Sequence, residues 1–403
     1  MFDTLNASQV EIKDWNTLYN WVAKEEESIS RISVHGLLNE KSSFLEDQYF
    51  GGKDFKLSFT ENGLKAFCYK IGFPVLAVQM LKEKELSSRM LNDLLNQEVV
   101  KEKLKNTDFV FDENTNDESD ADGKICGVVS SSYVGYSNHS FLNDIERIIG
   151  KQNLSATGTF NLKEAYSINT KLHLRLTSTH ISGIVTGRGG ISKDMTEIGL
   201  QFCNSMIGDS AVSIDYFLHR LVCANGLVLP ASKDGARVIH AGKIENFSAR
   251  LDRAYCDVLS GLGKKANYVT ELSDIEFSPR KLAELGLSKM IFDIIPRSKS
   301  TVIEKNSRIF NEFNFKSLNA EDRLTREALA IKHLPLSFAG HHSKVVFNSS
   351  FRDNASMFDL INVFTEHAKE QELGERVETQ RRAGMLAEWV INNKRKFKNN
   401  SAR

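Results

Sequence analysis

The chain has 403 residues, of which 41% are hydrophobic and 26% are charged. This composition excludes a mostly disordered or collagen-like chain, and the length leaves room for a sizeable core. Lysine plus arginine and aspartate plus glutamate both number 52, so no overall field marks a nucleic-acid or membrane binder, and any such site must come from local segregation of charge.

The segment before residue 106 has a helical pattern. Pro74 follows Gly72 and Phe73 and suits a first helical turn. Farther on, apolar residues recur at helical spacing and predict a helical region around residues 59–105. The residues of this stripe are Leu86, Met90, Leu91, Leu94 and Leu95. We therefore predict a mostly helical first region over residues 1–105.

An acidic run separates this region from the next one. Residues 112–122 hold six acidic residues, no basic residue and no apolar side chain larger than that of Ala121. Such a run repels itself and cannot bury surface, and its spacing does not match a calcium-binding loop. We predict a solvated linker or loop over residues 106–123.

An α/β core is predicted for residues 124–318. The stretch 124–129 alternates as a strand does. A helix is expected to follow, capped by Asn138 or Ser140 and ended by Gly150.

Two longer strands are predicted after residue 170. Leucines at positions 172, 174 and 176 alternate with polar residues, which predicts a half-buried strand with a polar face. Ile198, Leu200 and Phe202 repeat the alternation. Residues 183–190 between them are rich in glycine and too irregular for a tight hairpin, so we expect a flexible flap between paired strands.

A helix is predicted next. Asp209 or Ser210 can accept its first amide protons, Asn225 and Gly226 suit its end, and residues 227–229 then predict a short strand. Its apolar stripe is Ile214, Phe217, Leu218, Leu221 and Val222. This strand, flap, strand, helix order predicts an α+β fold with a central mixed or antiparallel sheet and helical additions at both ends.

Residues 319–403 predict a C-terminal helical region with a basic tail. Asn319 is the expected cap of one helix, Asp353 or Asn354 opens another, and residues 376–397 continue as a third. The last fifteen residues hold five bases and no acid: Lys394, Arg395, Lys396, Lys398 and Arg403.

One candidate binding surface is the polar face of the strand after residue 170. Lys171, His173, Arg175 and Thr177 lie on one face, and Arg188 in the flap can close over it. A basic sheet face under a glycine-rich flap suits a phosphate backbone. The competing interpretation is an ordinary solvated sheet face, and the strand has no aromatic ladder for base stacking.

The second candidate is a dense polar cluster on the predicted strand end and helix. Its members are Asn204, Ser205, Asp209, Ser210, Arg220, Cys223, Asn225 and Gly226. A strand end that meets a helix N-terminus suits an anion such as phosphate, although the same residues can simply satisfy backbone groups at a turn. A nucleophile built from Cys223, His219 and Asp215 is disfavoured, because side chains one turn apart on a helix diverge.

The sequence gives little support for a metal or a cofactor. The five cysteines form no CxxC pair and predict reduced thiols in a cytoplasm. The histidines lack ligand spacing, and no glycine-rich segment completes a dinucleotide or phosphate-loop pattern. We expect no metal site, no cofactor, no secretory signal and no membrane span, and therefore a soluble protein of the host cytoplasm.

Five segments in order resemble the signatures of domain-of-unknown-function family 932, found in phage/plasmid-like proteins. They are Thr60–Pro74, Gly127–Tyr133, Asn204–Ser210, Arg220–Leu227 and Asn362–Ala368. Gly127, Ala224 and residues 364–367 depart from the family pattern. The resemblance implies a mobile-element setting, phage, prophage or plasmid, and no established reaction. More loosely, the predicted core is similar to the β-β-β-α unit of phage single-strand annealing recombinases.

The leading hypothesis is a non-enzymatic nucleic-acid-associated protein of a mobile element that binds single-stranded or double-stranded DNA, or anneals single strands. One alternative is an inhibitor that binds a host defence or replication factor. Another is an enzyme centred on Asn204, Asp209 and Arg220. A homo-oligomer is compatible with all three.

Overall fold

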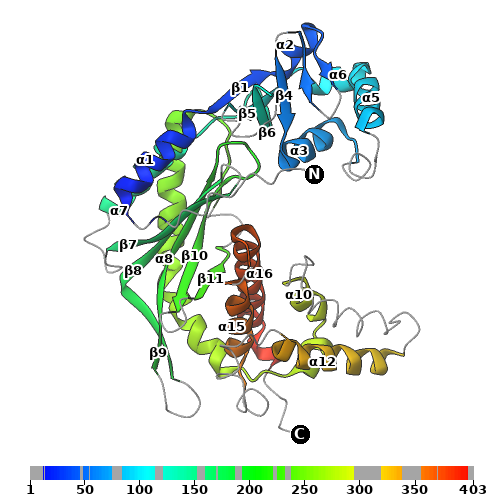
Figure 1. Cartoon of the computed structure of the whole chain (residues 1–403). Coiled ribbons are helices and arrows are strands. Elements are labelled where there is room, and N and C mark those ends of the chain that lie inside the picture. The colour runs from blue at the N-terminus through cyan, green and yellow to red at the C-terminus, as the bar shows by residue number, and fades with distance from the viewer. Residues whose placement is uncertain are drawn as a thin grey trace.

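Two β-sheets, each with its own helical layer, organise the chain (Figure 1). We call the elements between residues 29 and 130 the small lobe, which lies at the top of Figure 1, and the remainder the main lobe. The computed structural model describes residues 12, 14–45, 49–53, 55–74, 84–113, 121–151, 159–168, 171–186, 193–220, 225–231, 237–294, 319–337, 355–369 and 371–397.

The sheet of the main lobe is an antiparallel meander of five strands in sequence order, with a short sixth strand on its fourth. The strands are β7 (Phe160–Ile168), β8 (Lys171–Thr186), β9 (Lys193–Ser205), β10 (Val212–Arg220), β11 (Asn225–Leu229) and β12 (Arg237–Val238). Leu172, Leu174 and Leu176 of β8 pair with β9 across one apolar face and are fully buried. Because every second side chain points to this face, the other face carries the polar residues of β8.

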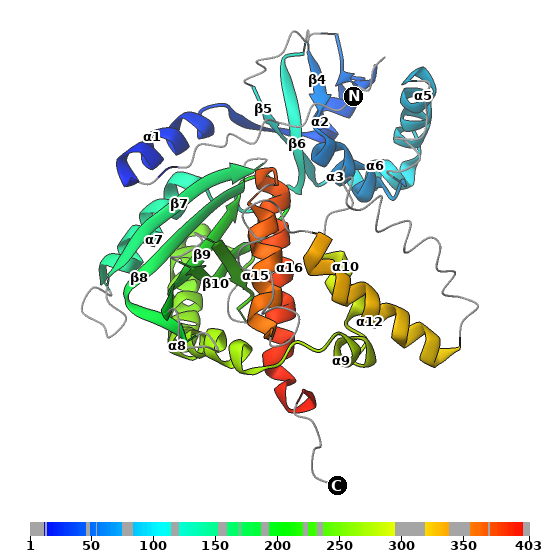
Figure 2. The same ribbon diagram turned by 60° about the horizontal axis from the view of Figure 1, so that its bottom comes forward.

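Helices cover both faces of this sheet. The apolar face is covered by α7 (Asn138–Lys151) and by the long α8 (Phe247–Asp274), with α1 (Trp15–Glu26) packed against α7. The polar face is crossed by α16 (Leu373–Asn392), which packs on α15 (Met357–Ala368), as Figure 2 shows. Leu373 and Val377 of α16 contact Tyr166 of β7, while Gly384 lies against Val228 of β11.

The small lobe has a six-stranded sheet in which only the β4–β6 pair is parallel. Its strands are β1 (Ile29–Ser33), β2 (Ser43–Phe44), β3 (Phe50–Gly51), β4 (Lys56–Phe59), β5 (Thr107–Asp112) and β6 (Gly123–Ser130). Its helices are α2 (Val34–Asn39), α3 (Glu61–Ile71), α5 (Lys84–Leu95) and α6 (Glu98–Leu104). Five phenylalanines with ring centroids 5.4–5.8 Å apart fill its core: Phe44, Phe50, Phe59, Phe67 and Phe109.

A third group of helices flanks α16. It comprises α9 (Pro279–Glu284), α10 (Ser288–Asp293) and α12 (Ala320–Ser337), and α12 packs on the other two. Two short 3-10 turns precede α8 and follow α16: η2 (Ile244–Asn246) and η4 (Lys394–Lys396). Across the described ranges, no helix combines the length and the apolar character that crossing a bilayer requires.

The α+β fold with a central antiparallel sheet and C-terminal helices is confirmed. The strands expected at residues 124–129, 172–176, 198–202 and 227–229 and the helix expected after Asn138 are all present. The Asn319 side chain accepts a 2.8 Å hydrogen bond from the amide of Asp322, as expected of a cap. Helix α15 is capped instead by Ser356, which forms a capping box with Asp359; residues 353 and 354 lie outside the described ranges.

The helix predicted after Asp209 is wrong, because these residues form the strand β10. Val212, Ile214, Tyr216 and Leu218 alternate toward α8, as a strand requires. Phe217 is also buried, on the face covered by α16. A strand covered on both faces carries apolar residues at both parities, so its pattern fits a helical stripe. The strand–flap–strand–helix order is therefore a run of paired strands.

Two further features of the fold were not foreseen. The 28-residue helix α8 was missed, although Phe247, Leu251, Tyr255, Val258 and Leu262 recur at helical spacing and are buried. Strands β1–β4 lie within the segment predicted to be mostly helical. The proposed boundaries at residues 105, 123 and 318 stay a prediction.

The acidic run lies between β5 and β6, which pair antiparallel. At its ends, the amide of Glu113 donates to the carbonyl of Ser28 (2.8 Å), and the Asp122 carboxylate accepts from the amide of Lys56 (2.7 Å). Residues 114–120 are outside the described part of the chain.

Candidate functional site

The polar face of β8 is buried, contrary to the expectation of a solvated surface. Arg175 is 1% exposed, and His173 and Thr177 are also buried. Lys171 at the start of the strand is partly exposed and pairs with Asp209 at 3.0 Å. Arg188 lies outside the described residues. The cause is α16, which crosses this face and which the local sequence of β8 does not reveal.

Arg175 holds α16 against the sheet. Its guanidinium donates to Gln201 Oε1 of β9 (2.6 Å) and to Gln380 Oε1 of α16 (2.7 Å), and it pairs with Glu164 of β7. Burial alone would raise the pKa of Glu164, but attraction to Arg175 and to Arg376 at 3.7 Å outweighs it and holds that pKa below its usual value. Each of the three guanidinium nitrogens of Arg175 thus has an acceptor within the protein.

His173 is held neutral beside this network. Its ring stacks on Tyr166 with centroids 4.9 Å apart, and its Nε2 lies 4.0 Å from the sulfur of Cys203. Burial, and then the positive charges of Arg175 and Lys171, lower the pKa of His173 to about 3. Burial also raises the pKa of the Cys203 thiol to about 12. Neither group is therefore charged near neutral pH.

The first part of the polar cluster divides between the two faces of the sheet. Asn204 is buried and donates to the carbonyl of Tyr136 and to Asn138 Oδ1, both at 2.9 Å. Ser205 points to the opposite face and donates to Asp209 Oδ1 at 2.5 Å. These contacts fix the turn between β9 and β10.

The rest of the cluster lies at the far end of β10. That strand has nine residues, so roughly 27 Å of backbone separate the turn at Asp209 from Arg220. The structure therefore does not bring Asn204, Asp209 and Arg220 together. Cys223, like the side chains of Arg220 and Asn225, is outside the described part.

Gly226 has a packing role in this hairpin. An added Cβ would lie 2.8 Å from the Phe217 ring and 3.3 Å from Gln380 Nε2. Only glycine therefore lets β11 approach the side chains that lie beneath α16.

Asp215 and His219 are not neighbours. Four residues apart on a strand they are separated by roughly 13 Å. The His219 Nδ1 lies 3.3 Å from Glu197 Oε2, which also pairs with Lys163 at 3.3 Å. Burial lowers the pKa of His219 and raises that of Asp215.

The family-like segments Gly127–Tyr133 and Asn204–Ser210 meet where the two lobes join. The Tyr133 hydroxyl donates to the carbonyl of Ser205 at 2.9 Å. A Cβ on Gly127 would lie 2.5 Å from the carbonyl oxygen of Ile207, and one on Gly208 would lie 2.5 Å from Val129. These glycines therefore allow the turn between β9 and β10 to pack against the small-lobe sheet. The sequence motifs taken separately did not predict this contact.

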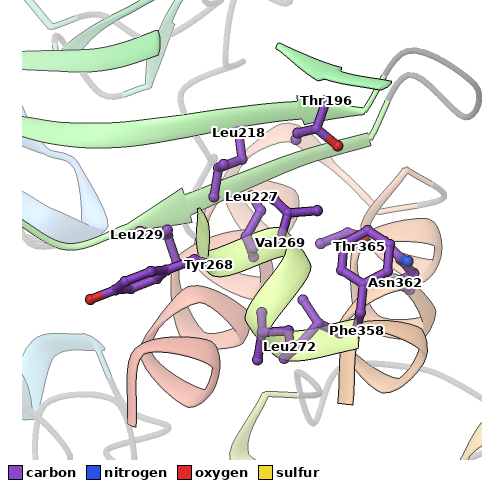
Figure 3. Close-up of a pocket in the computed structure, with 12 residues that line it drawn as sticks. Thr196, Leu218, Leu227, Leu229, Tyr268, Val269, Leu272, Phe358, Asn362 and Thr365 are labelled. Atoms are coloured by element: carbon purple, nitrogen blue, oxygen red, sulfur yellow. Dashed lines mark hydrogen bonds between the residues drawn. The ribbon is translucent and has the colours of Figure 1, made fainter. Parts of the chain in front are cut away.

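A cavity lies between the β10–β11 hairpin, α8 and α15 (Figure 3). Leu218, Leu227, Leu272 and Phe358 are among its apolar lining residues, and Thr196, Asn362 and Thr365 are among its polar ones. Its volume of about 20 Å³ is close to what one water molecule needs, whereas ligand pockets span roughly 300–1,000 Å³. We interpret it as a packing gap.

The basic end of α16 is an exposed charged surface. We use this name for Trp389, Lys394, Arg395, Lys396 and Phe397. The three bases are exposed, and the two aromatic rings are half-buried. Figures 1 and 2 both show this end of α16 directed away from the small lobe.

Most of the charge at the basic end of α16 is unneutralised. Lys394 Nζ donates to Glu271 Oε2 at 2.8 Å, and Lys396 Nζ lies 5.4 Å from the centre of the Trp389 ring. Arg395 has no carboxylate partner among the described residues. Trp389 and Phe397 meet edge to face with centroids 6.5 Å apart. Cations beside partly open aromatic rings are the groups that contact phosphates and unstacked bases.

No group of three or more histidine, cysteine, aspartate or glutamate side chains arranged to hold a metal occurs in the described ranges.

A family model described as domain of unknown function 932 matches residues 126–386. No curated protein and no solved structure matches the chain. The predicted family resemblance is confirmed, and the matched segment begins inside β6 and ends inside α16.

Proposed function

The chain belongs to the family of domain of unknown function 932, whose description specifies no reaction, and from the geometry of its own residues we propose that it binds nucleic acid without catalysis. The binding surface is the basic end of α16. The observation that carries the proposal is the run of three exposed cations, Lys394, Arg395 and Lys396, beside two half-buried aromatic rings. The proposal replaces the face of β8, where Arg175 is saturated by protein partners.

Single strands are the favoured ligand. Duplex DNA offers phosphates to Lys394, Arg395 and Lys396 but keeps its bases stacked, so the rings of Trp389 and Phe397 add nothing to its binding. An unpaired base can stack on an aromatic side chain, which contributes about 1–3 kcal/mol per base. The mobile-element setting and host-cytoplasm location stay part of the proposal and rest on the family resemblance and the sequence.

A salt titration tests the electrostatic part. The triple variant Lys394→Gln, Arg395→Gln, Lys396→Gln should bind a labelled oligo(dT) ~10-fold or more weakly at low salt, because up to three phosphate contacts are lost. Its plot of log affinity against log salt should be shallower by about 2, at ~0.7 per phosphate for a single strand. Fluorescence anisotropy measures both quantities.

A control variant removes two positive charges elsewhere. Lys101→Gln with Lys105→Gln neutralises two exposed lysines on α6 of the small lobe and should leave binding unchanged. Failure of the full chain to bind at low salt, or equal salt slopes for the full chain and the triple variant, would refute the proposal.

A protein partner is the second candidate, and one observation favours it. Tyr69 of α3 and Val99 of α6 are 88% and 69% exposed, both on the helical layer of the small lobe. Exposed aromatic and aliphatic side chains of this kind anchor protein interfaces. A host factor retained in stoichiometric amount after nuclease treatment, by a chain that binds no oligonucleotide, would favour this inhibitor-like role.

A further inference from the structure

The loop between β12 and α8 carries two exposed isoleucines. Ile239 is 61% exposed and Ile244 is 52% exposed. The other large apolar side chains that are exposed in the described ranges lie singly on separate helices. We call residues 237–246 the isoleucine loop. A pair of exposed isoleucines five residues apart is the kind of local apolar surface that marks an interaction site.

The isoleucine loop is held in place by a buried histidine. His240 exchanges hydrogen bonds with Val134: the Val134 amide donates to the His240 carbonyl (3.1 Å), and His240 Nδ1 lies 3.2 Å from the Val134 carbonyl. The His240 ring stacks on Tyr133 with centroids 5.0 Å apart. Arg250 donates to the carbonyl of Ile239 at 3.1 Å. Because the backbone is fixed, binding through the isoleucines costs little conformational entropy.

The charges that flank Ile244 are of opposite sign. Lys243 and Glu245 are both exposed, and neither has an ion-pair partner in the described part of the chain. If two copies of residues 243–245 meet antiparallel about an axis through Ile244, Lys243 of each copy faces Glu245 of the partner subunit. Isologous contacts of this kind place every residue pair twice in the interface.

We propose that the isoleucine loop is a homodimer contact, in which Ile239 and Ile244 of two copies pack together about a twofold axis and Lys243 pairs with Glu245 across it. The proposal stands independently of nucleic-acid binding, because it uses a different surface. Four isoleucines, two from each copy, and two ion pairs form a small interface, so the dimer should be weak and dependent on concentration.

Light scattering after size exclusion, repeated over a range of loading concentrations up to ~100 μM, tests it. The mass of the full chain should rise from that of one 45.4 kDa chain toward twice that value, and Ile239→Asp with Ile244→Asp should abolish the rise. Leu329→Asp places a carboxylate on an exposed apolar site of α12 and should leave the rise intact. Circular dichroism shows whether each variant is folded.

Charge exchange separates this contact from any other dimer. Lys243→Glu alone sets two carboxylates against each other at both ends of the contact and should weaken dimerisation ~10-fold or more, as should Glu245→Lys alone. The double variant restores both pairs with reversed sign and should dimerise as the unaltered chain does. A chain that stays monomeric leaves the isoleucines to another partner and overturns the proposal, as does a dimer indifferent to these changes.

Discussion

Arg175 is a buried arginine whose three guanidinium nitrogens each donate to a protein acceptor. Placing a guanidinium away from water is costly, and this cost is offset only where geometry and hydrogen bonds are good. Two glutamine oxygens and the Glu164 carboxylate supply them, and the Phe217 ring lies 4.8 Å from the Arg175 Cζ. Binding of a phosphate here would require breaking these contacts, so the residue serves the fold.

Glu25 of α1 is a buried acid whose pKa shifts in the opposite direction from that of Glu164. Its Oε1 accepts from the Ser167 hydroxyl at 2.9 Å, and its Oε2 is buried without a partner among the described residues. Burial raises the pKa of Glu25 to about 7; the Ser167 hydrogen bond opposes this rise, and the charges of Asp112 and Glu26 add to it. The folded protein therefore favours the protonated acid.

Glu25→Gln should make stability less dependent on pH. Because the folded-state pKa of about 7 exceeds the reference value of 4.5, the stability that protonation provides is complete below pH 4.5 and is lost as pH rises through 7. The glutamine variant lacks this loss, so it should be about 3 kcal/mol more stable than the unaltered chain at pH 8 and similar at pH 5. Urea denaturation at both pH values measures the difference.

Glu27→Gln is the control for this prediction, because Glu27 is exposed at the end of the same helix. It should shift both denaturation curves by less than about 0.5 kcal/mol. Parallel stability curves for the Glu25 variant and the unaltered chain between pH 5 and pH 8 would contradict the assignment of a protonated Glu25.

Helix α16 depends on a glycine where it crosses β11. A Cβ added at Gly384 would lie 1.7 Å from the carbonyl oxygen of Val228, which is backbone and cannot rotate away. Gly384→Ala should therefore force the helix off the sheet and cost about 1–3 kcal/mol or more. A Cβ added at Gly263, on the exposed side of α8, would meet no atom within 4 Å. Gly263→Ala should therefore instead stabilise the folded protein by about 0.5–1 kcal/mol. Thermal melts that move in the same direction for both would refute this account of the packing.

Strand β10 shows why a local pattern can mislead. Its apolar residues at 214, 217 and 218 fit a helix, because one of them faces α16 and the other two face α8. A helix with one covered face and a strand with two covered faces give the same pattern here. Which of them forms depends on helices more than twenty residues away in the chain.

Strand β6 belongs to the sheet of the small lobe and also contacts the main lobe. This strand pairs with β4 and β5 of the small lobe, yet the family match begins at its residue Cys126. Val129 of β6 also packs against Ile207 of the main lobe. The family segment by itself would thus contain a strand without partners and half of an apolar contact.

Residues 126–386 expressed alone should not fold cooperatively. They lack β4 and β5, the helix α1 that packs on α7, and the last turn of α16, where Val390 and Ile391 are buried. Residues 1–397 should melt as the full chain does, which controls for shortening as such. Calorimetry distinguishes the two, and a single sharp transition for residues 126–386 close to that of the full chain would contradict the shared-strand argument.

Local patterns were sufficient for much of the fold. Alternation at residues 172–176 and 198–202 and the cap at Asn319 depend on neighbours within a few residues, and the structure has those elements. The helix expected after Asn138 is also present, but Ser137 caps it. The family assignment was also correct. Hydrophobic periodicity could also have predicted the helix α8, because apolar residues recur at regular helical spacing from Phe247 onward.

Alternation alone determines that Arg175 and His173 share a face of β8, because successive side chains of any strand point to opposite sides. Whether that face meets water depends on α16, about two hundred residues later, whose Gln380 reaches Arg175 only in the folded chain. Burial is a property of contacts between distant segments, and no periodicity within one segment records it. Arg175 of β8 is therefore buried, whereas the basic residues that follow α16 are exposed.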